Sequence, residues 1–154
     1  MDGLVLECKA FSELTTLELY DLLRLRQEVF IVEQNCPYMD CDDKDQLSWH
    51  VLAYKDNTLI GYARLLRKGI SYDDYSSIGR VITHEDYRKM GVGQELMRYS
   101  IKKLQALDPG HDIKLSSQVY IMNFYAEFGF EAVGEPYLED DIPHHAMVLY
   151  AKSE

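Results

Sequence analysis

The segment that most restricts the fold is residues 77–107, where an apolar strand pattern is followed by a glycine-containing loop and a long helical pattern. Within residues 84–97, HEDYRKMGVGQELM, Arg88, Gly91 and Gly93 stand at R-x-x-G-x-G spacing just before the expected helix. Glycine destabilises a helix interior by roughly 1 kcal/mol relative to alanine, so two glycines here need a reason. One is a plain turn before the helix. The other is an anion that approaches the backbone amides at the helix N-terminus.

Two better known phosphate-binding motifs do not match this segment. A P-loop requires Lys followed by Ser or Thr after its last glycine, whereas Gly93 is followed by Gln94 and Glu95. The dinucleotide-binding motif G-x-G-x-x-G follows the first strand of its domain, whereas this loop follows the fourth expected strand. The segment is therefore predicted to be a different kind of anion-binding turn.

The rest of the chain alternates between strand and helix patterns. A capping box at Thr15 and Glu18 begins a first helix of about four turns, which should end before Pro37, and residues 35–48 form a polar, acidic loop. Asp56-Asn57 is a hairpin signal. Strands are expected over 4–9, twice within 49–68, and over 77–83, 112–118, 130–137 and 145–151, with further helices over 92–107 and 119–129. The order β α β β β α β α β β predicts an α/β (α+β) fold with helices on the sheet faces.

Composition limits the class of protein. The 154 residues fit one domain, residues 1–154, and the 47% hydrophobic and 27% charged residues are typical of a globular protein. The formal charge of −10 argues against charge-driven nucleic-acid binding. Neither a membrane-spanning apolar run nor a secretory signal is visible, so we expect a cytoplasmic protein with no membrane partner.

The three cysteines, Cys8, Cys36 and Cys41, are odd in number, and free thiols are their simplest interpretation. A zinc site made of Cys36, Cys41 and His50 is a weak alternative, because no fourth ligand is evident and the spacing matches no known zinc motif. We therefore expect no metal.

Four stretches carry a resemblance to a known family. They are RKMGVG with the strand IGRVIT before it, NFYAEFGF at residues 123–130, VFIVEQNCPYMDCDD at 29–43 and DDIPHHAM at 140–147. Together they resemble the GCN5-related N-acetyltransferase (GNAT) superfamily, and within it the ElaA-like branch. The resemblance implies a mixed, mostly antiparallel sheet with helices on both faces, and a fourth strand that diverges from the fifth.

The same resemblance implies that acetyl-coenzyme A is the cosubstrate. Its pyrophosphate would lie on the loop before the long helix, and its pantetheine arm would pair with the fourth strand. Asn123, close to the same site, is taken as a further coenzyme A contact, and so is Gln118, which keeps a side-chain amide where many relatives have asparagine. By position the loop and strand residues are Arg88, Lys89, Met90, Gly91, Val92, Gly93 and Gln94, and Val81, Ile82 and Thr83.

For catalysis, the resemblance places Tyr125 as the acid that protonates the departing thiolate and as a cofactor contact. Glu33 and His144 are the two candidates for a general base. Imidazole titrates near neutrality, whereas a glutamate would need burial to do so. Glu33 is slightly favoured, because it ends the first helix, which in the resembling family borders the acceptor side of the cleft. His50 is more simply interpreted as a structural histidine.

Acceptor recognition is less determined by the sequence. Arg64 and Arg80 lie on neighbouring expected strands, and together with Glu33 they could contact the substrate; two arginines in the cleft would indicate a carboxylate or phosphate group. Alternatively, one of them neutralises the acidic loop at 40–45. Both interpretations remain open.

The predicted function is an N-acetyltransferase that moves an acetyl group from acetyl-CoA to a primary amine by direct attack. The acceptor would be a small molecule or a peptide amine. Two alternatives are a non-catalytic acyl-CoA-binding regulatory module and an interaction domain whose glycines only make a turn. The sequence leaves monomer and homodimer open.

Overall fold

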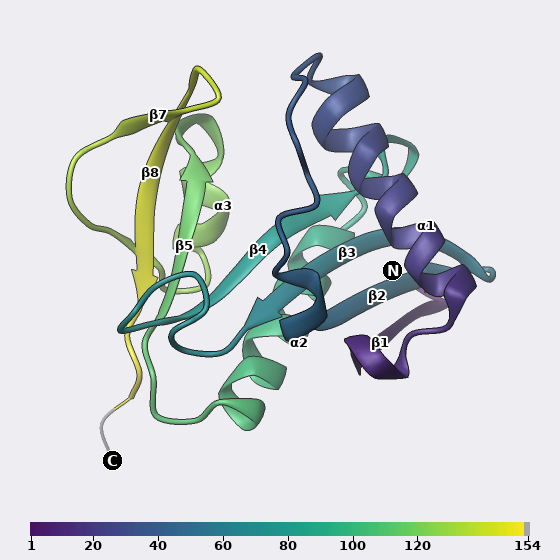
Figure 1. The fold of residues 1–154 in the computed structure, drawn as a ribbon, viewed down its shortest axis with the longest axis horizontal. Helices are drawn as coiled ribbons and strands as arrows, with labels where there is room; N and C mark the ends of the chain where they lie inside the picture. Colours follow the sequence, from purple (N-terminus) through teal and green to yellow (C-terminus); the bar gives the residue numbers. More distant parts are fainter. Residues whose placement is uncertain (153–154) are drawn as a thin grey trace.

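The computed structural model describes residues 1–152, which form an open eight-stranded sheet (Figure 1). Its strand order is β1-β2-β3-β4-β5-β8-β6, with β7 also pairing with β8. Neighbouring strands run antiparallel except β4 and β5, which run parallel, so the expected mostly antiparallel sheet is confirmed. The strands are β1 (Leu4–Ala10), β2 (Trp49–Lys55), β3 (Thr58–Leu66), β4 (Ser76–Thr83), β5 (Ile113–Gln118), β6 (Glu131–Ala132), β7 (Tyr137–Glu139) and β8 (Ile142–Leu149).

The three α-helices are α1 (Thr16–Arg26), α2 (Val92–Leu107) and α3 (Met122–Ala126). The Thr15 hydroxyl accepts a hydrogen bond from the Glu18 amide at 3.1 Å, and the Glu18 carboxylate accepts one from the Thr15 amide at 2.8 Å, which confirms the capping box. Beyond α1 the chain continues as a π-helix, η2 (Gln27–Glu33), which the sequence pattern did not predict. Among residues 1–152, no helix is both long and apolar enough to cross a bilayer.

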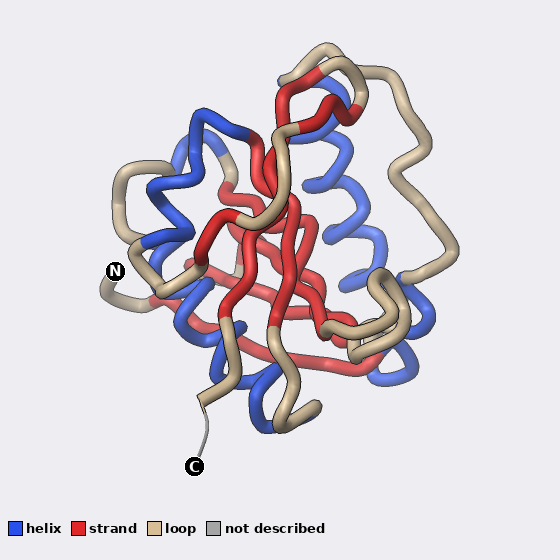
Figure 2. The backbone as a smooth tube through the Cα atoms, turned by 90° about the vertical axis from the view of Figure 1, so that its left-hand side faces the viewer, coloured by secondary structure: helices blue, strands red, loops and turns tan. Residues whose placement is uncertain are grey.

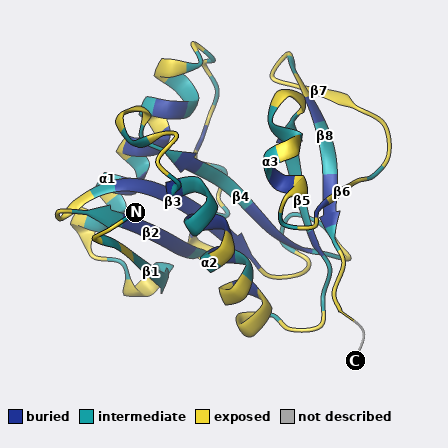
Figure 3. Cartoon of the chain, turned by 180° about the vertical axis from the view of Figure 1, so that it is seen from behind, coloured by how far each residue is buried: buried dark blue, intermediate teal, exposed yellow. Residues whose placement is uncertain are grey.

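Helices cover both faces of the sheet (Figure 2). Because strand side chains alternate between faces, β2 and β3 contribute to two apolar cores, and both strands are buried along most of their length (Figure 3). In one core α2 and α3 pack on the sheet, and in the other α1 packs on the opposite face. The first contains Val51, Ala53, Ala63, Leu65, Leu96, Met97 and Tyr125, and the second Leu22, Leu25, Val29, Leu52, Tyr62 and Ile82.

The expected strand over residues 130–137 is wrong in its extent. Only Glu131–Ala132 and Tyr137–Glu139 pair with β8, and the residues between them form a loop. Gly134 adopts a left-handed φ of 70° there, and Pro136 has no N–H to give to a sheet. The last antiparallel pair is therefore one long strand, β8, with two short partners.

Strands β4 and β5 pair only at their beginnings, at Ser76 with Ile113 and Ser77 with Lys114. Beyond this point they separate, and β5 continues alongside β8 (Figure 1). The pairing of β4 with β3 shifts register near Arg80, whose φ of 52° is left-handed. A bulge bends a strand and increases its twist, which accounts for the divergence that the sequence led us to expect.

Candidate functional site

A cavity of about 620 Å³ lies between the separated strands β4 and β5. Its wall is built from η2, the following loop, β4, the loop before α2, β5, the segment 120–125 that includes Tyr125 of α3, and the β7–β8 hairpin. Of the residues predicted from sequence, the cavity brings together Glu33, Arg80, Val81, Ile82, Thr83, Arg88, Lys89, Gln118, Tyr125 and His144. Those that do not line it are Arg64, Met90, Gly91, Val92, Gly93, Gln94 and Asn123.

The loop before α2 has the character of an anion site. The first hydrogen bond of the helix runs from the Glu95 amide to the Gly91 carbonyl oxygen, at 3.1 Å. Within residues 1–152, the backbone N–H groups of residues 89–94 have no hydrogen-bond acceptor. Free amides at the start of a 16-residue helix, beside two basic side chains, attract negative charge.

The two glycines of this loop have different local roles. Gly91 adopts a left-handed φ of 85° at the N-cap of α2, a conformation that most side chains disfavour. Gly93 lies inside the helix, where an added Cβ would come within 3.4 Å of the Phe124 ring. Each glycine is thus explained by the turn or by packing, and open space remains around Gly91 for a ligand.

Beyond Ser77, no strand within residues 1–152 pairs with one edge of β4, and this edge faces the cavity. Val81, Ile82 and Thr83 lie on this edge. Backbone N–H and C=O groups along a free edge are available to a ligand that carries amides. The carbonyl oxygen of Thr83 accepts a hydrogen bond from Arg88 Nε at 3.0 Å, which connects the end of β4 to the anion-binding loop.

Tyr125 reaches the cavity from α3 and is 7% exposed. Its ring makes edge-to-face contacts with Phe124 and Phe130, at centroid distances of 5.1 and 6.2 Å. Burial, and secondarily the neighbouring Tyr120, raise the pKa of Tyr125 to about 12. The phenol therefore keeps its proton at neutral pH and can serve as a proton donor.

Glu33 lines the cavity, but both of its carboxylate oxygens are already engaged. Arg88 Nη1 lies 2.8 Å from Oε2, and Arg88 Nη2 donates to Oε1 at 3.0 Å. A two-pronged pair of this kind is strong and directional. It holds Glu33 against the loop before α2, with both carboxylate oxygens engaged.

His144 also lines the cavity, and its side chain is 9% exposed. Its Nδ1 lies 2.7 Å from the carbonyl oxygen of Ile142. Because a carbonyl only accepts hydrogen bonds, Nδ1 carries the proton and the neutral ring has its lone pair on Nε2. Of the two candidate bases, Glu33 has both carboxylate oxygens paired with a guanidinium, whereas the neutral His144 ring has a nitrogen, Nε2, without a proton.

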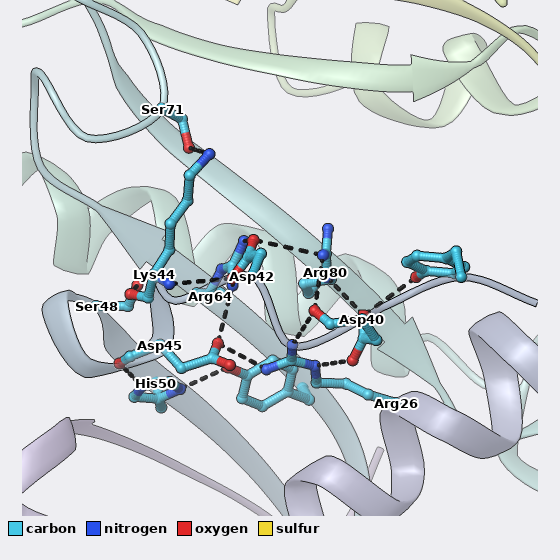
Figure 4. A network of polar contacts seen from close by, with 12 residues as sticks. Arg26, Asp40, Asp42, Lys44, Asp45, Ser48, His50, Arg64, Ser71 and Arg80 are labelled. Atoms are coloured by element: carbon cyan, nitrogen blue, oxygen red, sulfur yellow. Dashed lines mark hydrogen bonds and ion pairs between the residues drawn. The ribbon is translucent and has the colours of Figure 1, made fainter. Parts of the chain in front are cut away.

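The expectation that both Arg64 and Arg80 point into the cleft is wrong for Arg64. Its Nη1 and Nη2 donate to Asp42 and Asp45 at 2.7–2.8 Å, and it does not line the cavity (Figure 4). Arg80 does line it, but its Nε lies 2.8 Å from Asp40 Oδ1. Both arginines therefore neutralise the acidic loop, as the alternative interpretation proposed for one of them.

Arg26 of α1 completes this network. It is fully buried, and it donates to Asp40 Oδ2 at 2.7 Å and to Asp45 Oδ1 at 2.8 Å (Figure 4). The network holds the loop after η2 against α1, β3 and β4. Two loop residues that the sequence did not assign to the acyl-CoA cleft, Cys36 and Tyr38, thereby become part of the cavity wall.

His50 is a structural histidine, as expected. It is fully buried; its Nδ1 is bonded to the Tyr62 hydroxyl, and its Nε2 to the Asp45 carbonyl oxygen at 2.9 Å. Both ring nitrogens are thus occupied and unavailable to a metal. In residues 1–152 no group of His, Cys, Asp or Glu side chains is arranged to hold a metal ion.

Comparison with known proteins agrees with this architecture. Residues 24–151 match the family model described as "Acetyltransferase (GNAT) domain". The chain is 44% identical to the protein ElaA of Escherichia coli over 140 residues, which is 88% of this chain and 90% of ElaA. The crystal structure of an acyl-CoA N-acyltransferase from Pseudomonas aeruginosa superposes with a TM-score of 0.88 at 40% identity, covering 94% of this chain and 98% of that one.

A more distant structure, a GNAT family acetyltransferase from Elizabethkingia anophelis with acetyl-CoA bound, shares the fold. Its TM-score is 0.66 at 15% identity, and the alignment covers 97% of this chain and 99% of that one. The divergent sheet, the glycine loop before α2 and these matches lead to one assignment. The chain belongs to the GNAT acetyltransferase superfamily, in its ElaA-like branch.

Proposed function

We propose that this protein transfers an acetyl group from acetyl-CoA to a primary amine. One observation carries the proposal: the free edge of β4 and the buried Tyr125 phenol line one cavity, and the wall of that cavity at Arg88 and Lys89 belongs to the loop with the unpaired amides of residues 89–94. The loop suits a pyrophosphate, and the strand edge suits the amides of a pantetheine arm. The related fold from Elizabethkingia anophelis that holds acetyl-CoA supports this choice.

In the proposed reaction the neutral amine attacks the thioester carbonyl carbon. As the C–N bond forms, the nitrogen gives one proton to His144 Nε2. The C–S bond breaks with its electron pair staying on sulfur, and Tyr125 gives the sulfur a proton. Solvent exchange then restores the protonation of both side chains, so that one amide and one thiol are produced.

We assign the base to His144 rather than to Glu33. The Glu33 carboxylate is held on both oxygens by Arg88, whereas Nε2 of His144 presents a lone pair to the cavity. Glu33 remains a candidate contact for the acceptor, because it lies on the cavity wall beside the cofactor loop.

The test is a panel of small amines and amine-bearing peptides incubated with acetyl-CoA while free thiol release is followed. We expect thiol release that depends on at least one amine, with the acetylated product visible by mass spectrometry. Calorimetry with acetyl-CoA accompanies the assay. Binding without turnover towards any amine would indicate a non-catalytic acyl-CoA-binding module, and absence of binding would indicate an interaction domain.

A further inference from the structure

The β7–β8 hairpin brings a second carboxylate to the candidate base. Residues 140–141 form its turn with φ values of 51° and 61°, the geometry of a two-residue type I′ turn. This turn sets a register in which Glu139 faces Ile142 and Tyr137 faces His144. Directly opposed residues share one face of a hairpin. Glu139, Ile142 and His144 accordingly all line the cavity.

The carboxylate of Glu139 is directed at the catalytic nitrogen of the imidazole. Its Oε2 lies 3.3 Å from Nε2 of His144, the atom that holds the lone pair in the neutral ring. A carboxylate accepts hydrogen bonds and cannot donate them. The contact is therefore favourable only after Nε2 has taken up a proton.

We infer that Glu139 is a positioning residue, which acts through His144 by stabilising the imidazolium formed when Nε2 takes the proton of the acceptor amine. The inference rests on the proposed function, because the proton that Nε2 takes up is the one that the acceptor amine loses in the proposed acetyl transfer. Glu139 takes no proton in this step, and the proton leaves Nε2 for solvent after the transfer. As in other acid–base sites, a carboxylate beside the imidazole stabilises its protonated form.

The groups around His144 come from several elements. On β7, Tyr137 stacks on the imidazole at a centroid distance of 6.2 Å and an angle of 22°, and its hydroxyl is bonded to Ser116 of β5. Gln118 of β5 is the uncharged register partner of His144. Arg80 of β4, Tyr125 of α3 and Asp140 of the hairpin turn line the same cavity. Among these groups, Glu139 is the carboxylate with a recorded contact to Nε2.

Glu139 should stabilise the His144 imidazolium only modestly, because the Glu139 side chain is 55% exposed and water screens its charge. Removing the carboxylate should make the imidazolium less stable and so lower the pH at which His144 titrates. From the usual strength of exposed ion pairs, we expect a shift of about 0.2–0.7 pH unit. The acidic limb of kcat/KM should move to lower pH by the same amount.

The experiment compares wild type, Glu139→Gln and Asp141→Asn. Histidine ring resonances are titrated by NMR, with His144→Gln identifying the His144 signal, and the pH profile of kcat/KM is measured on the same samples. Asp141→Asn removes an equal charge from the same turn and keeps its left-handed backbone, because asparagine tolerates that conformation. We expect the shift in Glu139→Gln and none in Asp141→Asn.

Three results would overturn the inference. Equal shifts in the two variants would mean that His144 responds to the net negative charge of the hairpin and not to the contact with Glu139. No shift in Glu139→Gln would mean that the contact does not affect the protonation of His144. A kinetic limb that stays in place while the NMR midpoint moves would remove Glu139 from catalysis. Failure of the proposed function looks different: no amine is acetylated, while the NMR titration still decides whether Glu139 controls the protonation of His144.

Discussion

At the scale of single residues, the environment of Tyr125 decides its chemistry. The chain has 12 tyrosines, and Tyr125 is a buried one whose ring is packed between Phe124 and Phe130 while it also borders the cavity. Burial raises its pKa to about 12, so the phenol stays protonated across the neutral range. It should not itself produce a basic limb in the pH profile between about pH 6 and 9.

Tyr125→Phe removes one hydroxyl and keeps the aromatic packing. If Tyr125 protonates the leaving thiolate, we expect kcat to fall by about 10²–10⁴, with acetyl-CoA affinity and melting temperature nearly unchanged. Stopped assays of thiol release and calorimetry measure both quantities. Tyr99→Phe is the matched control, because Tyr99 lies on α2 and does not line the cavity. Full activity in Tyr125→Phe would transfer the acid role to water or to another side chain.

At the scale of elements, the Arg88–Glu33 ion pair connects the loop before α2 to η2. Arg88 holds Glu33 at 2.8 and 3.0 Å and also donates to the Thr83 carbonyl oxygen at 3.0 Å. Three segments, η2, β4 and the loop before α2, therefore meet at one guanidinium. A pyrophosphate bound to the loop would compete with Glu33 for the same guanidinium.

Glu33→Gln should free Arg88 and strengthen acetyl-CoA binding by about two- to five-fold at low salt, from the usual strength of a partly exposed ion pair. Calorimetry at low and high ionic strength tests this, and the gain should shrink at high salt. Glu28→Gln is the control, because Glu28 is an acidic residue of the same helix that pairs with Arg24 instead. Weaker binding in Glu33→Gln would mean that the pair holds the loop in its binding conformation.

Gly91→Asn tests the loop itself. Asparagine tolerates the left-handed backbone that Gly91 adopts, and an added Cβ meets no protein atom within 4 Å. The fold should be retained, so that the new side chain obstructs only a ligand lying against the amides. We expect at least a ten-fold loss of acetyl-CoA affinity by calorimetry, with circular dichroism and melting temperature close to wild type. Unchanged affinity would mean that Gly91 serves only the turn.

At the scale of the whole molecule, a network of arginine–aspartate pairs connects α1, β3 and β4 to the loop after η2. Arg26 of α1, Arg64 of β3 and Arg80 of β4 all bond to the acidic loop that follows η2 (Figure 4). Burial alone would raise the pKa of Asp42, but its hydrogen bond and charge interaction with Arg64 outweigh that effect and lower the pKa to about 2. The wall of the cavity thus depends on buried carboxylates remaining ionised.

The ionisation of Asp42 therefore predicts that the folded state loses stability in acid. Because the folded-state pKa of Asp42 lies below its usual 3.8, Asp42 stabilises the fold above that pH and loses this contribution as the pH falls towards 2. One pKa unit corresponds to about 1.4 kcal/mol, so the loss is on the order of 2 kcal/mol. Urea unfolding at pH 7, 4 and 2.5 should show wild type losing this stability in acid.

Asp42→Asn should already lack that contribution at pH 7, so its curve and that of wild type should converge in acid. Asp43→Asn is the control, since Asp43 is an exposed neighbour whose left-handed φ of 64° asparagine accepts. If the gap between wild type and Asp42→Asn stayed constant from pH 7 to 2.5, the ionisation of Asp42 would not support the loop.

The sequence alone determined what depends on neighbours along the chain. The Thr15–Glu18 capping box, the hairpin at Asp56-Asn57 and the strand, loop and helix around Gly91 were all predictable, because local pattern and backbone preference set them. The position of Tyr125 in its motif was predictable too, although its burial was not. The sequence pattern predicted one strand over 130–137, whereas Gly134 and Pro136 divide this segment into two short strands.

Only the tertiary structure decided which side chains meet. Glu33 and Arg88 are 55 positions apart, and Arg64 and Asp42 are 22 apart, so no local pattern shows either pair. The partners of the arginines, the free edge of β4 and the approach of Glu139 to His144 follow from how strands diverge and which faces they share. Such contacts are set by the packing of distant segments around a common core, which composition and periodicity do not encode residue by residue.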